Sequence, residues 1–111
     1  MNINDLYSLF TVPPQMITHP RNVTTIQNQR VQISCTAQGI PRPTITWKKK
    51  REDGQRLNER VTSTNTRDRV NSTITIPRVQ TRDAGVYICT ATNKATTRPI
   101  EQEITLLVQG N

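Results

Sequence analysis

The chain has 111 residues, which is room for one domain of common size. Its 11 Ile, 8 Val and 18 Thr outnumber its 5 Leu and 4 Ala, which argues against a helical bundle because β-branched residues favour strands. No apolar run approaches the ~18 residues of a membrane helix, so no membrane span is predicted. The net charge of +7 favours a polyanionic ligand, but 1 Trp, 2 Tyr and 1 Phe offer few rings for stacking nucleic-acid bases, so nucleic acid is not a predicted partner.

The cysteines are Cys35 and Cys89, and even with the lone His19 they are too few for a structural zinc site, so no metal is predicted. A disulfide is the natural use of the pair. Closing a loop of about 55 residues stabilises a fold by roughly 4 kcal/mol in the chain-entropy model. Because such a bond persists in oxidising compartments, an extracellular location is expected, and the alternative is two buried free thiols in a cytosolic protein.

Residues 1–13 lack the positive start and the unbroken apolar stretch of a secretory leader. Pro13 and Pro14 then stiffen the chain and mark the start of the domain. Residues 1–13 are interpreted as a linker, a leftover of cloning or a loosely ordered arm, and residues 14–109 as the folded domain.

Beyond the two prolines, apolar and polar residues alternate with a period of two, and turn residues follow at short intervals. This pattern predicts strands at 30–35, 44–47, 71–76, 87–91 and 103–108. Strands at such spacing with no helical stretch between them are typical of an antiparallel β-sandwich.

Cys35, then Trp47 twelve residues on, and the run Asp83-Ala84-Gly85-Val86-Tyr87-Ile88-Cys89 together resemble an immunoglobulin domain. The resemblance implies an all-β, antiparallel Greek-key sandwich with Cys35 on strand B, Trp47 on strand C and Cys89 on strand F. It implies a disulfide between the two sheets and packing of the indole beside it.

Within this family, the segment 39–49 and the run Thr90-Ala91-Thr92-Asn93 are similar to the intermediate set of adhesion molecules, receptors and matrix proteins. The opening Pro13-Pro14 and His19-Pro20 resemble first immunoglobulin domains of Roundabout and of LAR-type receptor phosphatases. The resemblance implies neighbouring immunoglobulin or fibronectin-type domains. Residues 48–58 are long for a C to C′ connection, and the turn 93–96 lacks the usual Gly.

The resemblance also assigns structural roles near the second cysteine. Tyr87 is expected to return its hydroxyl to the backbone near the E to F corner. Gly85 is expected to hold a backbone conformation that a side chain would penalise. An arginine is expected to pair with Asp83, with Arg60 best placed and Arg67 and Arg69 as rivals.

For catalysis the sequence offers one His and carboxylates scattered along the chain. These do not form a Ser/His/Asp set or a metal cluster, so we predict that the chain is not an enzyme and has no cofactor.

Basic residues concentrate in one fifteen-residue stretch. A cluster of this kind suits heparan sulfate, which several Lys and Arg would bind through sulfate or carboxylate groups. The alternative is a solubilising loop offset by Glu52 and Asp53. The heparan sulfate candidates are Arg42, Lys48, Lys49, Lys50, Arg51 and Arg56.

The outward face of strands C, F and G is the second candidate surface. By alternation, exposed Ile88 and Leu107 could seed an adhesive interface, although scattered exposed apolar residues are also ordinary. The predicted contact residues are Thr46, Ile88, Thr90 and Leu107.

Two sequons, at Asn22 and Asn71, could accept glycans, although composition alone accounts for about two such motifs. Taken together, the sequence predicts an extracellular recognition module of a receptor or adhesion protein. It would bind proteins, homophilically or heterophilically, with heparan sulfate as a further ligand. The alternatives are a module of a secreted matrix protein and an intracellular muscle or cytoskeletal domain.

Overall fold

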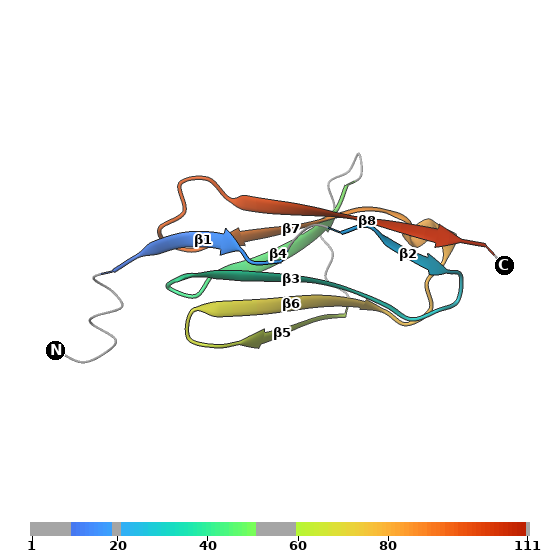
Figure 1. Cartoon of the computed structure of the whole chain (residues 1–111), viewed down its shortest axis with the longest axis horizontal. Coiled ribbons are helices and arrows are strands. Elements are labelled where there is room, and N and C mark those ends of the chain that lie inside the picture. Colours follow the sequence, from blue (N-terminus) through green and yellow to red (C-terminus); the bar gives the residue numbers. More distant parts are fainter. Residues whose placement is uncertain (1–9, 19–20, 51–59, 111) are drawn as a thin grey trace.

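The computed structural model describes residues 10–18, 21–50 and 60–110. These residues form two four-stranded sheets that pack face to face, with a single 3₁₀ turn, η1 (Thr81–Asp83), before the seventh strand (Figure 1). Among them, no helix is long and apolar enough to cross a membrane. The β-sandwich expected from the alternating pattern is confirmed.

The first sheet has the strand order β1-β3-β6-β5, and all its pairs are antiparallel. β1 (Val12–Met16) and β5 (Val61–Asn65) are its edges, while β3 (Val31–Ile40) and β6 (Arg69–Ile76) form its centre.

The second sheet has the order β2-β8-β7-β4. Its strands are β2 (Val23–Ile26), β8 (Ile100–Gln109), β7 (Gly85–Thr92) and β4 (Thr44–Lys49). One pairing differs from the antiparallel expectation, because β2 runs parallel to β8. The chain leaves the first sheet after β1 and joins the second beside β8, the last strand, which runs in the same direction.

Each predicted strand lies within or almost within an observed one, and the observed strands are longer. β1, β2 and β5 were not predicted, because two prolines interrupt β1, β2 has only four residues, and β5 is exposed beyond Val61. β1 begins at Val12, which pairs with Ile40, so residues 12 and 13 of the expected arm belong to the sandwich. The β1 register shifts between Val12 and Gln15, where the prolines offer no N–H to the ladder.

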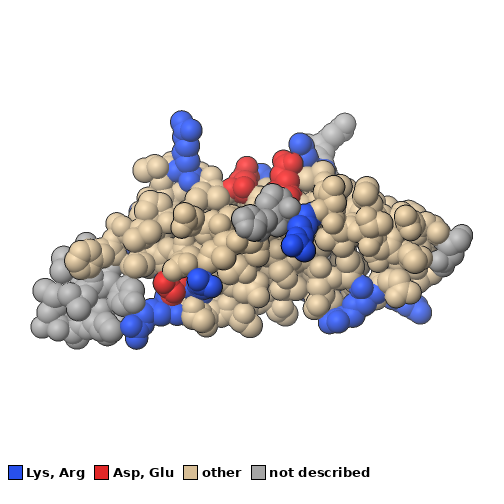
Figure 2. Space-filling model, in the orientation of Figure 1, with Lys and Arg blue, Asp and Glu red and all other residues tan. Residues whose placement is uncertain are grey.

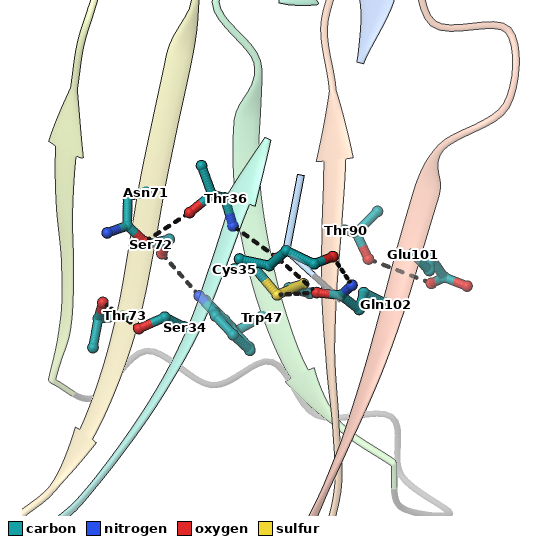
Figure 3. The surroundings of a disulfide bond; sticks show 12 residues. Ser34, Cys35, Thr36, Trp47, Asn71, Ser72, Thr73, Thr90, Glu101 and Gln102 are labelled. Atoms are coloured by element: carbon teal, nitrogen blue, oxygen red, sulfur yellow. Dashed lines mark hydrogen bonds between the residues drawn. A yellow bond between two sulfur atoms is a disulfide. The ribbon is translucent and has the colours of Figure 1, made fainter. Parts of the chain in front are cut away.

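The core lies between the sheets, where Cys35 of β3 and Cys89 of β7 form the disulfide. Trp47 is buried against this bridge, and its Nε1 donates a hydrogen bond of 2.8 Å to Ser72 Oγ on β6 (Figure 3). The alternating pattern therefore produces a thin core that one covalent bond and one buried hydrogen bond connect across the sheets.

Gln102 is a buried polar residue that the sequence reasoning did not identify. Its Oε1 accepts a hydrogen bond of 2.9 Å from Thr18 Oγ1, and its Nε2 donates to the Thr18 carbonyl oxygen. Thr18 Oγ1 in turn accepts from Thr36 N at 3.2 Å. Gln102 Oε1 also lies 3.4 Å from Cys35 Sγ, a close contact since a disulfide sulfur has no proton to donate (Figure 3). Gln102 therefore fixes the chain where it passes from one sheet to the other.

Candidate interaction surface

The corner before β7 is built on Asp83 and Tyr87. The Tyr87 hydroxyl donates a hydrogen bond of 2.6 Å to the Asp83 carbonyl oxygen. The Asp83 carboxylate accepts a hydrogen bond of 2.8 Å from Gln80 N, which closes the 3₁₀ turn. The role proposed for Tyr87 thus corresponds to an observed contact.

The ion pair between Arg60 and Asp83 is not formed. Among the described residues the ion pairs are Lys48–Glu101 and Lys50–Glu103, and Asp83 takes part in neither. Arg60 instead adopts a positive φ of 55°, and its carbonyl oxygen accepts from Thr75 N at 3.1 Å. Its rivals Arg67 and Arg69 lie by the β5–β6 turn, at the end of β5 opposite to Arg60. The Asp83 carboxylate instead accepts a hydrogen bond from the backbone of its own turn.

Lys49 occupies the space beneath this corner, contrary to its assignment as a heparan sulfate ligand. β4 continues through Lys49, so its side chain points inward with only 7% of its surface exposed. Lys49 Nζ donates a hydrogen bond of 2.7 Å to the Arg82 carbonyl oxygen and lies 5.6 Å from the centre of the Tyr87 ring. Lys49 is therefore a structural cation and is not available to a polyanion.

Gly85 follows the same corner and adopts a φ of +143°. A β-carbon built there would lie 2.9 Å from Lys49 Cε, closer than real β-carbons approach. Both the backbone and the buried lysine thus explain why this position is glycine.

The other basic candidates that the structure describes do not form one patch. Lys48 Nζ lies 3.4 Å from Glu101 Oε2 and Lys50 Nζ lies 3.9 Å from Glu103 Oε1, both on the exposed surface. Arg42 precedes β4, at the opposite end from Lys50, and its Nη1 donates to the Thr66 carbonyl oxygen at 2.9 Å. Arg51 and Arg56 lie outside the described residues, as does most of the C to C′ connection.

Ile88, at the centre of the outward face of β2-β8-β7-β4, was expected to be exposed. Only 7% of its surface is exposed, so it does not offer an apolar contact to a partner. Its register neighbours are Lys48 on β4 and Glu103 on β8. The two ion pairs join Lys48 on β4, and Lys50 directly after it, to glutamates of β8 across β7. The long side chains of these pairs therefore pass over Ile88 and cover it. Figure 2 shows red and blue atoms together along the upper edge of the molecule.

Lys48, Lys50, Glu101 and Glu103 form a charged belt across this face. Thr46 and Thr90 are partly exposed next to the charged belt, and Leu107 is 49% exposed. The sequence reasoning missed Ile26, which is 46% exposed on β2. In the parallel register, Thr24 lies beside Leu107 and Ile26 beside Gln109, so Ile26 and Leu107 share the outward face. No sequence signal marked Ile26, because β2 itself was not predicted.

Both sequon asparagines are exposed. Asn22 precedes β2, and Asn71 lies within β6, where its Oδ1 accepts a hydrogen bond of 3.2 Å from Thr36 Oγ1 (Figure 3).

Comparison with known proteins decides the family. Residues 13–93 match the family model described as immunoglobulin domain. The chain belongs to the immunoglobulin family. This agrees with the two sheets, the disulfide between them and the buried tryptophan beside it.

Three curated relatives show how such a domain is used within longer chains. Human hemicentin-1 is 40% identical over 98 residues, mouse protogenin 38% over 84 and bovine neural cell adhesion molecule 1 31% over 97. These alignments cover 88%, 75% and 86% of this chain but only 2%, 6% and 11% of the relatives. The chain therefore corresponds to a small part of each relative's length.

Solved structures agree with the fold. A chain of the titin M10–obscurin-like 1 Ig complex matches with a TM-score of 0.71 and 25% identity, over 90% of this chain and 97% of that one. The titin M3 domain matches with a TM-score of 0.69 and 25% identity, over 89% and 99%. The similarity to the intermediate set, and to Roundabout and LAR-type receptors, stays a prediction.

Proposed function

We propose that this chain is a non-catalytic recognition module of an extracellular receptor or adhesion protein. We further propose that the outward face of its β2-β8-β7-β4 sheet binds a second copy of the module. The disulfide supports an oxidising compartment. One relative carries the name neural cell adhesion molecule, which supports a role in contact between proteins.

The arrangement of charge on the outward face carries the proposal. Lys48 and Lys50 lie on β4 or directly after it, Glu101 and Glu103 lie on β8, and β7 runs between them. A two-fold axis along β7 would place the lysines of one copy over the carboxylates of the other. Because the ion-paired side chains are 45% to 65% exposed and each carboxylate can accept several hydrogen bonds, a second lysine can be bound there.

The same face supplies uncharged area around the charged belt. Thr46 and Thr90 pair directly beside it, and Ile26 and Leu107 expose apolar surface towards the other end of the sheet. Protein interfaces commonly combine an apolar part with a polar, solvent-accessible rim. The partner chemistry that fits this face is therefore a flat sheet with alternating charge, which a second copy provides.

A charge-swap experiment tests the proposal. The variants are Lys48→Glu/Lys50→Glu, which makes the belt wholly acidic, and Glu101→Lys/Glu103→Lys, which makes it wholly basic. Sedimentation equilibrium should show self-association of the unaltered chain, monomers for each variant alone, and association again when the two variants are mixed. The matched control Arg67→Glu/Arg69→Glu reverses two charges away from this face and should associate like the unaltered chain.

A chain that remains monomeric at millimolar concentration would overturn homophilic binding and leave a different protein as the partner. Association of each variant alone, equal to that of the unaltered chain, would show that the charged belt is not the interface.

A second candidate has its own support. The similarity to titin domains favours an intracellular muscle or cytoskeletal domain. The redox state of Cys35 and Cys89 in the protein isolated from its natural source separates the two, because a cytosolic domain would carry free thiols. Thiol labelling under denaturing conditions would detect them. A secreted matrix protein remains the extracellular alternative.

A further inference from the structure

Three strand connections meet at one end of the sandwich. They are residues 41–43 between β3 and β4, 66–68 between β5 and β6, and 93–99 between β7 and β8. β1 begins at the same end, on the left of Figure 1. The sequence separates these segments by 23 residues or more, so only the fold brings them together.

Hydrogen bonds fix the connection 41–43 to both of the other connections. Asn93 Nδ2 donates to the carbonyl oxygens of Val12 at 2.9 Å and of Pro41 at 2.8 Å. Arg42 Nη1 donates to the Thr66 carbonyl oxygen at 2.9 Å. The backbones of these turns are therefore held at defined positions relative to each other, which lowers the entropy cost of ordering the turns when a ligand binds.

The turn 93–96 shows how this rigidity arises without glycine. Asn93 N donates to Thr96 Oγ1 at 2.7 Å, Ala95 N to Asn93 Oδ1 at 2.9 Å, and Thr96 N to the Asn93 carbonyl oxygen at 3.0 Å. The asparagine side chain thus supplies a hydrogen bond that holds this turn, at a place where the family usually has glycine.

The three connections and the residues next to them form a basic pole. Thr66 N donates to the Arg69 carbonyl oxygen at 3.0 Å, so Arg67 and Arg69 belong to one tight turn that also contacts Arg42. The turns carry one carboxylate, Asp68, which accepts a hydrogen bond of 3.0 Å from Gln38 Nε2. The exposed residues of the basic pole are Arg42, Arg67, Arg69, Lys94 and Arg98.

We propose that the basic pole binds a sulfated glycosaminoglycan. Arginine presents a planar fork of donors that matches the oxygens of sulfate and carboxylate groups. A linear polyanion can contact several turns at once, and each contact releases a counterion. A sulfated sugar is favoured over single-stranded nucleic acid because successive bases stack on several aromatic rings, and the described residues have one strongly exposed ring, Phe10, just before β1 at this end.

This site differs from the basic edge predicted from the sequence. Lys49 is buried, while Lys48 and Lys50 face carboxylates on β8. Of the edge candidates that are described, Arg42 alone belongs to the basic pole. The proposal is independent of the homophilic face, because the two sites share no residue.

Heparin affinity across a salt series tests the proposal with two variants of equal charge. Arg42→Ser/Arg67→Ser/Arg69→Ser removes three cations from the basic pole. The matched control Arg30→Ser/Arg78→Ser/Arg82→Ser removes three exposed cations from the opposite end. At physiological salt the pole variant should lose at least about ten-fold in heparin affinity, and the slope of its logarithmic affinity against logarithmic salt concentration should fall by about 2. The control should lose about three-fold in affinity or less.

Two further variants keep the outcome decisive. Arg67→Ser/Arg69→Ser/Arg98→Ser leaves the Arg42 hydrogen bond intact and should give the same loss, with a thermal midpoint close to that of the unaltered chain. Lys48→Ser/Lys50→Ser should retain heparin binding. Equal losses in the pole variant and the control would overturn the proposal in favour of diffuse attraction, and a dominant loss in Lys48→Ser/Lys50→Ser would move the site to the edge. Competition by single-stranded DNA as effective as that by heparin would overturn the assignment to a sulfated sugar.

Discussion

Replacement of Gly85 by alanine should destabilise the domain for two separable reasons. The φ of +143° lies in a region that is nearly restricted to glycine, and holding another residue there costs on the order of 1 to 3 kcal/mol. The new β-carbon would also lie 2.9 Å from Lys49 Cε, which forces the lysine away from the Arg82 carbonyl oxygen. Losing a hydrogen bond to a charged, buried group costs about 1 to 3 kcal/mol, so weakening this one costs at most that much. We expect a total loss of ~3 kcal/mol.

Urea denaturation followed by the fluorescence of Trp47 measures this loss. A loss of ~3 kcal/mol corresponds to a midpoint lower by roughly 1 to 3 M urea. Gly110→Ala is the matched control, because a β-carbon at Gly110 meets no atom of the described residues within 4 Å. Its midpoint should equal that of the unaltered chain.

The two causes separate in a Lys49→Ala background. Lys49 is the residue that the new β-carbon would contact in the described part of the chain, so in this background Gly85→Ala should cost only the backbone part, about 1 to 3 kcal/mol. A Gly85→Ala midpoint equal to that of the unaltered chain would refute the whole argument. An equal cost in both backgrounds would refute the part assigned to Lys49.

Two further predictions concern the core. Ser72→Ala leaves the Trp47 indole N–H buried without an acceptor, so chemical denaturation should show a loss of stability of about 1 to 3 kcal/mol. The control Ser34→Ala, on an exposed hydrogen bond, should change stability by less than about 0.5 kcal/mol. Equal effects of the two variants would contradict the role of the buried hydrogen bond. Replacing Cys35 and Cys89 by alanine should cost ~4 kcal/mol for a crosslink spanning 54 residues, and a cost below about 1 kcal/mol would contradict its role in stability.

The central strands were predictable because a half-buried strand records its burial in every second side chain. In β3, Val31, Ile33, Cys35 and Ala37 are buried and alternate with more exposed neighbours, as the sequence pattern indicates. The alternation of apolar and polar residues is weaker in the edge strands. β5 faces solvent after its first residue, and β1 is interrupted by prolines, so neither shows the period of two.

The candidate site was less predictable because it depends on where strands end and on which neighbours they meet. Residues 45, 47 and 49 continue the inward alternation of β4, but the strand was expected to end at 47, with Lys49 in the loop that follows. The buried acceptor provided by Arg82 lies far along the chain. Ile88 was correctly placed on the outward face, yet side chains from β4 and β8 cover it.

The sequence by itself determined the two-layer sandwich, because local alternation fixes which face of each strand is buried. Its two cysteines predicted the Cys35–Cys89 disulfide, and the resemblance to immunoglobulin domains implied the place of Trp47 beside it. The tertiary structure alone decided which surface residues lie together. The basic pole joins three turns that are distant in sequence, and the parallel pairing of β2 with β8 sets Ile26 on the same face as Leu107. Such proximity depends on long-range strand pairing, which no local pattern records.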